Sequence, residues 1–100
     1  MKYNKLVRDN IPERIQQKGE KVVTHVASDE EYWNKLIEKL GEEIKEFKKS
    51  ENIEELADIL EVLQAIANYK GFDKKEVRRV MQKKSKEKGK FDRRIILDES

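Results

Sequence analysis

The sequence predicts an all-α protein: an antiparallel helical bundle of three main helices plus a short N-terminal helix, present as an oligomer. Apolar residues recur every three or four positions through most of the chain, which is the period of a buried helix face. Capping residues precede these periodic segments and glycines follow them. The 100 residues suffice for a single domain over residues 1–100, and the absence of cysteine excludes disulfides and Cys-based zinc sites.

The N-terminal quarter is expected to hold one short helix between two irregular segments. Residues 1–11 should form an arm, and Pro12 suits the first turn of a helix over about 12–18. Gly19 suits the end of that helix. The β-branched run that follows predicts a small extended piece near 22–27.

A capping box predicts the start of the first long helix, over about 29–49. Ser28 is the N-cap residue of this box, and Glu31 stands three positions later. The helix carries a continuous apolar stripe at helical spacing. The stripe consists of Trp33, Leu36, Ile37, Leu40, Ile44 and Phe47.

The second long helix is expected over about 53–70, with Asn52 as its cap and Gly71 as its end. A single helical hairpin cannot bury both the broad apolar face of this helix and Trp33. Trp33 itself suits a contact in the core or in a dimer interface better than a base-stacking platform. We therefore expect a homodimer or homotetramer. The broad face consists of Ile53, Leu56, Ile59, Leu60, Leu63, Ile66 and Ala67.

The last helix is expected over about 74–88. A capping box of Asp73 and Glu76 precedes it, and Gly89 follows it. The helix is basic and its apolar stripe is thin. A second extended piece, near 92–97, is expected to cover the bundle as a tail.

Charge is distributed unevenly along the chain, although the formal net charge is only +2. Residues 29–62 carry 12 acidic and 5 basic residues, whereas residues 73–94 carry 4 acidic and 11 basic residues. Such a chain could bind a cation and a polyanion side by side. Alternatively, the opposite charges of its packed helices could neutralise one another. No apolar run approaches the roughly 20 residues of a membrane span, and the first ten residues lack a signal-peptide region. A cytoplasmic location with no membrane partner is expected.

The main chemical signal is a set of four carboxylates on the two long helices: Glu43, Glu46, Glu55 and Asp58. Each helix contributes a pair at i, i+3 spacing, which places both side chains on one face. On a helical wheel these four border or enter the apolar faces, whereas Glu42, Glu54 and Glu61 point to solvent. Because the helices should run antiparallel, the two pairs are expected to face each other.

Four carboxylates at close range repel one another and lose hydration. A hard divalent cation relieves this conflict, and all-oxygen ligands favour Mg²⁺, Mn²⁺ or Ca²⁺ over zinc. Mg²⁺ usually keeps positions open for water and phosphates, so we expect Mg²⁺ as the cofactor, Mn²⁺ as a substitute and a phosphate ester as the substrate. The alternative is that neighbouring lysines and bulk water satisfy the carboxylates.

These residues resemble the motifs of the MazG-like all-α nucleoside triphosphate pyrophosphohydrolases, a superfamily that includes dimeric dUTP pyrophosphatases and phosphoribosyl-ATP pyrophosphohydrolase. Its EExxE and ExxD motifs are matched by Glu42-Glu43-x-x-Glu46 and Glu55-x-x-Asp58. The two ends of the chain resemble a predicted house-cleaning branch of that superfamily. The matching segments are Tyr3-Asn4-Lys5-Leu6-Val7-Arg8-Asp9, Ile11-Pro12-Glu13, Lys88-Gly89-Lys90-Phe91 and Arg94-Ile95-Ile96-Leu97.

The resemblance implies Mg²⁺-dependent cleavage of a nucleoside triphosphate, including non-standard ones, to monophosphate and pyrophosphate. It implies that the four carboxylates hold Mg²⁺ and that Glu43 also orients the attacking water. It also implies that basic residues of the last helix bind the phosphates of the substrate. Lys84 would be a catalytic residue and a phosphate ligand, and Lys88 would be a phosphate ligand. The branch has Arg-Gly where Lys88-Gly89 stands, so a bidentate clamp is replaced by a point charge.

The N-terminal arm contains a compact charged group of Lys5, Arg8 and Asp9. Lys5 and Arg8 suit phosphate binding, across a subunit boundary. A salt-bridged surface arm accounts for the same residues equally well.

Two other functions remain open from the sequence. The basic helix 74–88 and the tail could form a small nucleic-acid-binding module, although this leaves the inward-leaning carboxylates unexplained. A purely structural helical oligomer is the third hypothesis. It predicts no change of thermal stability with Mg²⁺.

Overall fold

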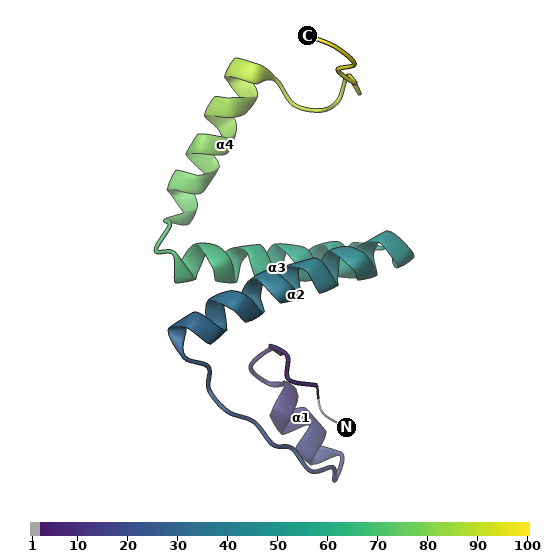
Figure 1. The fold of residues 1–100 in the computed structure, drawn as a ribbon, viewed down its shortest axis with the longest axis vertical. Coiled ribbons are helices and arrows are strands. Elements are labelled where there is room, and N and C mark those ends of the chain that lie inside the picture. Colours follow the sequence, from purple (N-terminus) through teal and green to yellow (C-terminus); the bar gives the residue numbers. More distant parts are fainter. Residues whose placement is uncertain (1–2) are drawn as a thin grey trace.

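The structure is a computed structural model that describes residues 3–100, and the regular secondary structure in this range is entirely helical (Figure 1). The helices are α1 (Ile11–Gln17), α2 (Asp29–Ser50), α3 (Ile53–Tyr69) and α4 (Lys74–Lys88). The expected all-α class is confirmed, and each helix begins and ends within one residue of its expected position. The first two residues of the expected N-terminal arm lie outside the described residues.

Side-chain caps begin the two long helices. The Ser28 hydroxyl accepts a hydrogen bond from the Glu31 backbone N–H at 3.3 Å. Asn52 Oδ1 accepts one from the Glu55 backbone N–H at 3.0 Å. Each bond satisfies one of the donors that a helix start leaves unpaired, so both predicted caps are confirmed.

The start of α4 differs from its prediction. Asp73 makes no side-chain capping bond, so the predicted capping box is wrong. The Glu76 carboxylate instead lies 3.7 Å from Arg79 Nη2, one turn further along the same helix. This i, i+3 ion pair competes with the capping contact for the Glu76 carboxylate.

Helices α2 and α3 form an antiparallel hairpin, which is the only pair of helices with extensive contact in the described part of the chain (Figure 1). Glu51 ends α2 in a left-handed conformation, with a φ of 53°, and its backbone N–H bonds to the Phe47 carbonyl at 2.8 Å. Leu36 is 1% exposed and is the one fully buried apolar side chain among residues 3–100. The core of a single copy is therefore thin.

Aromatic residues close the open end of this hairpin. The Tyr69 ring stacks on Trp33 at a centroid distance of 5.9 Å and meets the Tyr32 ring edge-on at 5.4 Å. The Tyr69 hydroxyl donates a hydrogen bond to the Asp29 carbonyl at 3.1 Å. Lys70 Nζ lies 4.1 Å from the centroid of the Trp33 ring. Trp33 is thus a packing residue of the hairpin.

Helix α4 leaves the hairpin and projects away from it (Figure 1). The turn that directs it is hydrogen-bonded: the Gly71 N–H donates to the Asn68 carbonyl at 3.1 Å, and the Phe72 N–H donates to the Ala67 carbonyl at 2.9 Å. Gly71 has a φ of 74°, a conformation that favours glycine. One copy therefore shows a packed pair of main helices, and the expected packing of α4 into a bundle is not seen within it.

The two segments expected to be extended have no regular secondary structure, and neither is a strand in the described residues. Residues 92–97 begin in a turn, closed by a hydrogen bond from the Arg94 N–H to the Phe91 carbonyl at 3.1 Å. Phe91 is 95% exposed and Ile96 is 78% exposed, so the tail does not cover the helices as expected. Within residues 3–100, no helix combines the length and the apolar character that a membrane crossing needs.

Candidate functional site

Three of the four predicted carboxylates meet between α2 and α3. One carboxylate oxygen from each of Glu43, Glu55 and Asp58 lies within 4.8 Å of those of the other two. Glu43 comes from the second half of α2 and is only 9% exposed, while the other two come from the first turns of α3 and are half-buried. Because the hairpin is antiparallel, the second half of α2 lies beside the first turns of α3. The acidic cluster, as we call these three residues, is therefore formed as the wheel and the hairpin topology predicted.

Glu46 does not join this group. Its side chain is exposed, and none of its oxygens falls within the 4.8 Å set. Its negative charge nevertheless contributes to the environment of Glu55. The helix turn that separates it from Glu43 carries it from the buried edge of the hairpin toward solvent.

The N-terminal arm lies against the hairpin and brings cations to the acidic cluster. Arg8 Nη2 lies 2.8 Å from Asp58 Oδ1, and Lys5 Nζ lies 2.8 Å from Glu42 Oε1. Lys35 Nζ donates a hydrogen bond to the Asn4 carbonyl at 2.7 Å and so ties the arm to α2. The two arm residues that were predicted to bind phosphate, Lys5 and Arg8, thus form salt bridges at the site.

Two residues at the site were missed or misplaced by sequence reasoning. Lys39 was not singled out, yet its Nζ lies 3.2 Å from Glu43 Oε1. The spacing of four residues along α2 was the available signal, because such residues are neighbours on a helix. Glu42 was expected to face solvent, but it is half-buried because Lys5 from the arm covers it.

Burial and the charges of the cluster both alter the acidity of Glu55. Partial burial raises the pKa of the Glu55 carboxyl, because burial disfavours its charged form. The negative charges of Asp58, Glu43 and Glu46 raise this pKa further. Arg8 pairs with Asp58 and Lys39 pairs with Glu43, whereas Glu55 forms no salt bridge within residues 3–100.

The pKa values of Glu42 and Lys5, which pair beside the acidic cluster, both shift so as to favour the charged forms. The hydrogen bond from Lys5 lowers the pKa of the Glu42 carboxyl, and the same bond raises the pKa of the Lys5 ammonium. Each shift favours the charged form, as expected of an ion pair. Glu42 is thus satisfied by the protein itself, whereas Glu55 is not.

Replacing Glu55 with Gln is expected to raise the melting temperature at pH 7 in the absence of divalent cations, because Gln keeps the volume and removes one repelling charge. The folded-state pKa of Glu55 lies above its ordinary value of 4.5, so the folded chain binds that proton more tightly than the unfolded chain. Ionised Glu55 therefore lowers the stability of the folded chain at pH values above the raised pKa, and this loss of stability disappears as the pH falls through that pKa. Thermal melts of both proteins from pH 7 to pH 4 should show the difference shrinking.

A matched control is Glu87→Gln, on the exposed surface of α4. It should show no gain that shrinks in this way over the same pH range. A Glu55→Gln protein that melts below the wild type at pH 7 would contradict the inferred repulsion.

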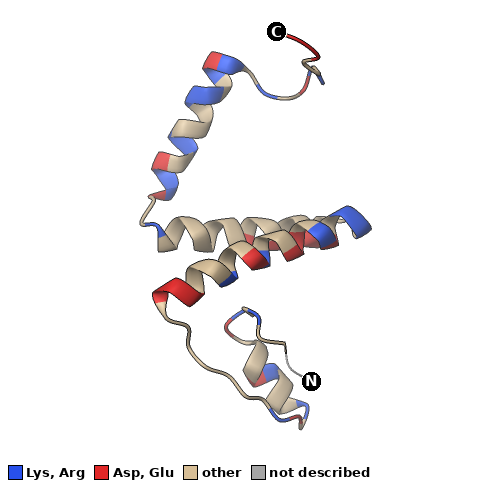
Figure 2. Ribbon diagram, viewed as in Figure 1, with Lys and Arg blue, Asp and Glu red and all other residues tan. Residues whose placement is uncertain are grey.

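The two predicted basic residues of α4 are not brought to the acidic cluster within one copy. Helix α4 makes no extensive contact with α2 or α3, so Lys84 and Lys88 stand apart from it. Figure 2 shows the same separation, with acidic residues gathered on the hairpin and basic residues along α4.

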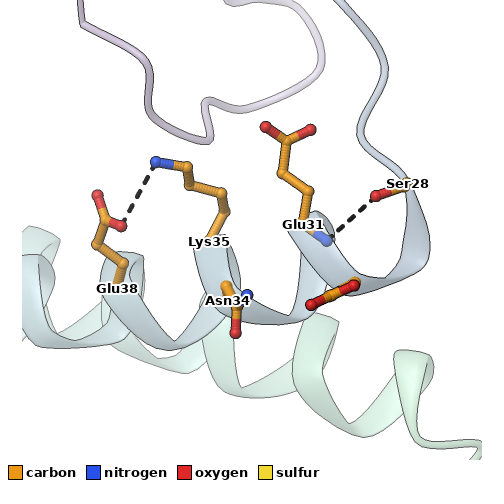
Figure 3. A pocket seen from close by; sticks show the side chains of 6 residues that line it. Ser28, Glu31, Asn34, Lys35 and Glu38 are labelled. Carbon is orange, nitrogen blue, oxygen red and sulfur yellow. Dashed lines mark hydrogen bonds and ion pairs between the residues drawn. The ribbon is translucent and has the colours of Figure 1, made fainter.

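A shallow surface depression lies elsewhere, along the first turns of α2 (Figure 3). Several of its polar groups already have partners: Ser28 caps the helix, and Lys35 Nζ lies 3.5 Å from Glu38 Oε2. It shares no residue with the acidic cluster. We therefore assign the candidate site to the cluster.

Comparisons with known proteins add little to this geometry. No family model matches the chain, and no solved structure matches it. A curated protein of Mycolicibacterium smegmatis, described as an uncharacterized protein, is 46% identical to this chain over 46 residues. The aligned part is 46% of this chain and 47% of that protein, so the chain matches about half of the relative's length.

Proposed function

We propose that this chain is a Mg²⁺-dependent nucleoside triphosphate pyrophosphohydrolase that converts a nucleoside triphosphate to a monophosphate and pyrophosphate. The observation that carries the proposal is the convergence of Glu43, Glu55 and Asp58 from two helices within 4.8 Å. Their donor set is entirely oxygen, which suits Mg²⁺ and, as a substitute, Mn²⁺. The raised pKa of Glu55 fits a site whose negative charge a cation would balance.

The proposed reaction is attack of water on the α-phosphorus. The water oxygen bonds to that phosphorus, the bond to the bridging oxygen breaks, and its electron pair leaves with pyrophosphate. Mg²⁺, when bound by the cluster, supplies charge neutralisation on the phosphates and makes a bound water more acidic. Glu43 would accept the proton of the attacking water, because it is the most buried carboxylate of the cluster.

The phosphates need cationic partners beside the carboxylates. Arg8 already lies at Asp58, and its planar guanidinium suits a phosphate as well as a carboxylate. Lys5, on the same arm, lies at Glu42, the residue before Glu43. In this proposal Lys84 and Lys88 act as phosphate ligands only where α4 of a neighbouring copy reaches a cluster, since α4 leaves its own hairpin.

A panel of nucleoside triphosphates incubated with Mg²⁺ is expected to yield monophosphate and pyrophosphate. In ¹⁸O-labelled water the label should enter the monophosphate, because attack occurs at the α-phosphorus. Mass spectrometry of both products checks this, and a reaction with excess chelator is the control. Orthophosphate and diphosphate as products would place the attack on the γ-phosphorus and reject the assignment.

A second candidate is a nucleic-acid-binding module, and one observation favours it. Helix α4 carries eight Lys or Arg residues and two Glu residues, and it stands clear of the hairpin (Figure 2). A free basic helix suits a phosphate backbone. Salt-sensitive binding of DNA or RNA, without Mg²⁺-dependent hydrolysis, would favour this candidate. It leaves the burial of Glu43 unexplained, and so we rank it second.

A further inference from the structure

The N-terminal arm is attached to the hairpin through charged side chains. Its described part, residues 3–10, makes two salt bridges to the helices: Lys5 Nζ lies 2.8 Å from Glu42 Oε1, and Arg8 Nη2 lies 2.8 Å from Asp58 Oδ1. One of these bridges ends on α2 and the other on α3. The arm therefore crosses both helices of the hairpin and is tied to each by an ion pair.

Apolar packing contributes little to this attachment. No residue of the described arm or of α1 is buried, and α1 makes no extensive contact with another helix within residues 3–100. The ion pairs are themselves open to water, since the side chain of Arg8 is 55% exposed and that of Asp58 is 38% exposed. Water and salt weaken such pairs. A competing charge can therefore replace them.

Arg8 occupies a carboxylate that we assign to the cation. Asp58 belongs to the acidic cluster, and one of its oxygens lies within 4.8 Å of those of Glu43 and Glu55. Arg8 Nη1 also lies 3.9 Å from Glu61 Oε1, one turn further along α3, so the guanidinium lies between two carboxylates. A guanidinium and a divalent cation are attracted by the same negative charge and repel each other. Arg8 and a cation at the cluster are thus competitors.

Arg8 differs from the other cations at the site. Lys39 Nζ lies 3.2 Å from Glu43 Oε1, but both residues are on α2, so the loss of this pair would free no other segment. Lys5 pairs with Glu42, which is outside the cluster. Among the salt bridges of residues 3–100, only that of Arg8 joins the arm to a member of the cluster.

We propose that the arm is a strap released by the cation: Arg8 leaves Asp58 when the acidic cluster binds Mg²⁺, and the arm then loosens from the hairpin. The inference rests on the cation site of the proposed function and adds a regulation of that site. The released guanidinium is free to pair with a phosphate beside the cation, so Mg²⁺ would bind before the phosphates. By linkage, a docked arm weakens Mg²⁺ binding by the same factor by which Mg²⁺ weakens docking of the arm.

The alternative role for Arg8 is to hold Asp58 in place for the cation. Hydrogen-bond partners behind a metal ligand can raise the affinity for the metal, so the two roles predict opposite effects of removing Arg8. Charge balance favours release. The three carboxylates together with Arg8 and Lys39 carry one net negative charge. A divalent cation would reverse the sign of this charge, and the departure of Arg8 restores neutrality.

Titration of the whole chain with Mn²⁺, without nucleotide, tests the strap, and the electron paramagnetic resonance signal of free Mn²⁺ reports binding. Arg8→Gln should bind Mn²⁺ about fivefold more tightly than the wild type, because the competing charge is gone. Arg8→Lys keeps the charge and should bind within about twofold of the wild type. Arg14→Gln is the matched control: Arg14 is exposed on α1 and forms no salt bridge within residues 3–100, so the affinity should not change.

Nuclear magnetic resonance of the wild type gives a second readout that does not depend on the folding of any variant. Addition of Mg²⁺ should lower the heteronuclear NOE of the backbone amides of residues 5–9, because a loosened arm moves on the nanosecond timescale. The amides of α2 and α3 should keep their values. In Arg8→Gln the arm amides should have low values before Mg²⁺ is added and should change little afterwards.

Three results would overturn the strap and leave the cation site in place. They are weaker Mn²⁺ binding by Arg8→Gln, which would assign Arg8 to holding Asp58; an equal change of affinity in Arg8→Gln and Arg14→Gln; and an arm whose NOE values stay constant at saturating Mg²⁺. Failure of the wild type and of Arg8→Gln to bind Mn²⁺ would instead reject the cation site of the proposed function, and the strap with it.

Discussion

Replacing Glu43 with Gln is expected to lower turnover of a nucleoside triphosphate by at least about 100-fold, the usual scale for loss of a general base. Glu43 is 9% exposed and stands within 4.8 Å of the two other carboxylates of the cluster, so it can hold a water beside a bound cation. Gln keeps the volume and one acceptor oxygen but cannot take the proton. Release of pyrophosphate, measured at saturating substrate and Mg²⁺, gives the change in kcat.

The variant should remain folded, since the change also relieves repulsion from Glu55 and Asp58. Its helical circular dichroism and thermal melt should match those of the wild type or exceed them. Glu38→Gln is the matched control, because Glu38 lies on the same helix, is exposed and pairs with Lys35 away from the cluster. If Glu43→Gln and Glu38→Gln turn over equally fast, Glu43 has no role in the chemistry.

Mg²⁺ or Mn²⁺ is expected to raise the melting temperature of the wild type. A ligand at ten times its dissociation constant that binds only the folded state adds about 1.4 kcal/mol to the free energy of unfolding. In a domain of this size that corresponds to a rise of roughly 5 to 10 °C. Glu55→Gln and Asp58→Asn should each abolish the rise, because each removes a ligand of the cluster. Melts with and without the cation provide the measurement.

Glu54→Gln is the matched control for this effect. Glu54 precedes Glu55 on α3, but its side chain is exposed and lies outside the converging set. The rise with Mg²⁺ should persist in this variant. If Glu54→Gln loses the rise as fully as Glu55→Gln does, the cation responds to the general negative charge of α3. The acidic cluster would then not be a specific site.

The helices and their boundaries are determined by the sequence alone. The caps at Ser28 and Asn52, the glycine at 71 and the periodic apolar residues act within a few positions of the chain, so local pattern suffices to predict them. The meeting of Glu43 with Glu55 and Asp58 was predictable for a related reason. A short connection forces two helices to run antiparallel, and the helical period then decides which side chains face each other.

Tertiary structure alone decided the rest of the site. Arg8 meets Asp58 across 50 positions of the chain, and Lys5 meets Glu42 across 37, separations at which no local period operates. The departure of α4 depends on how the turn at Gly71 directs the chain, and capping rules predict where a helix ends but not where the next one points. The sequence by itself therefore determined the helices and the acidic cluster. Only the packing of distant segments could show which cations reach that cluster and that α4 leaves the hairpin.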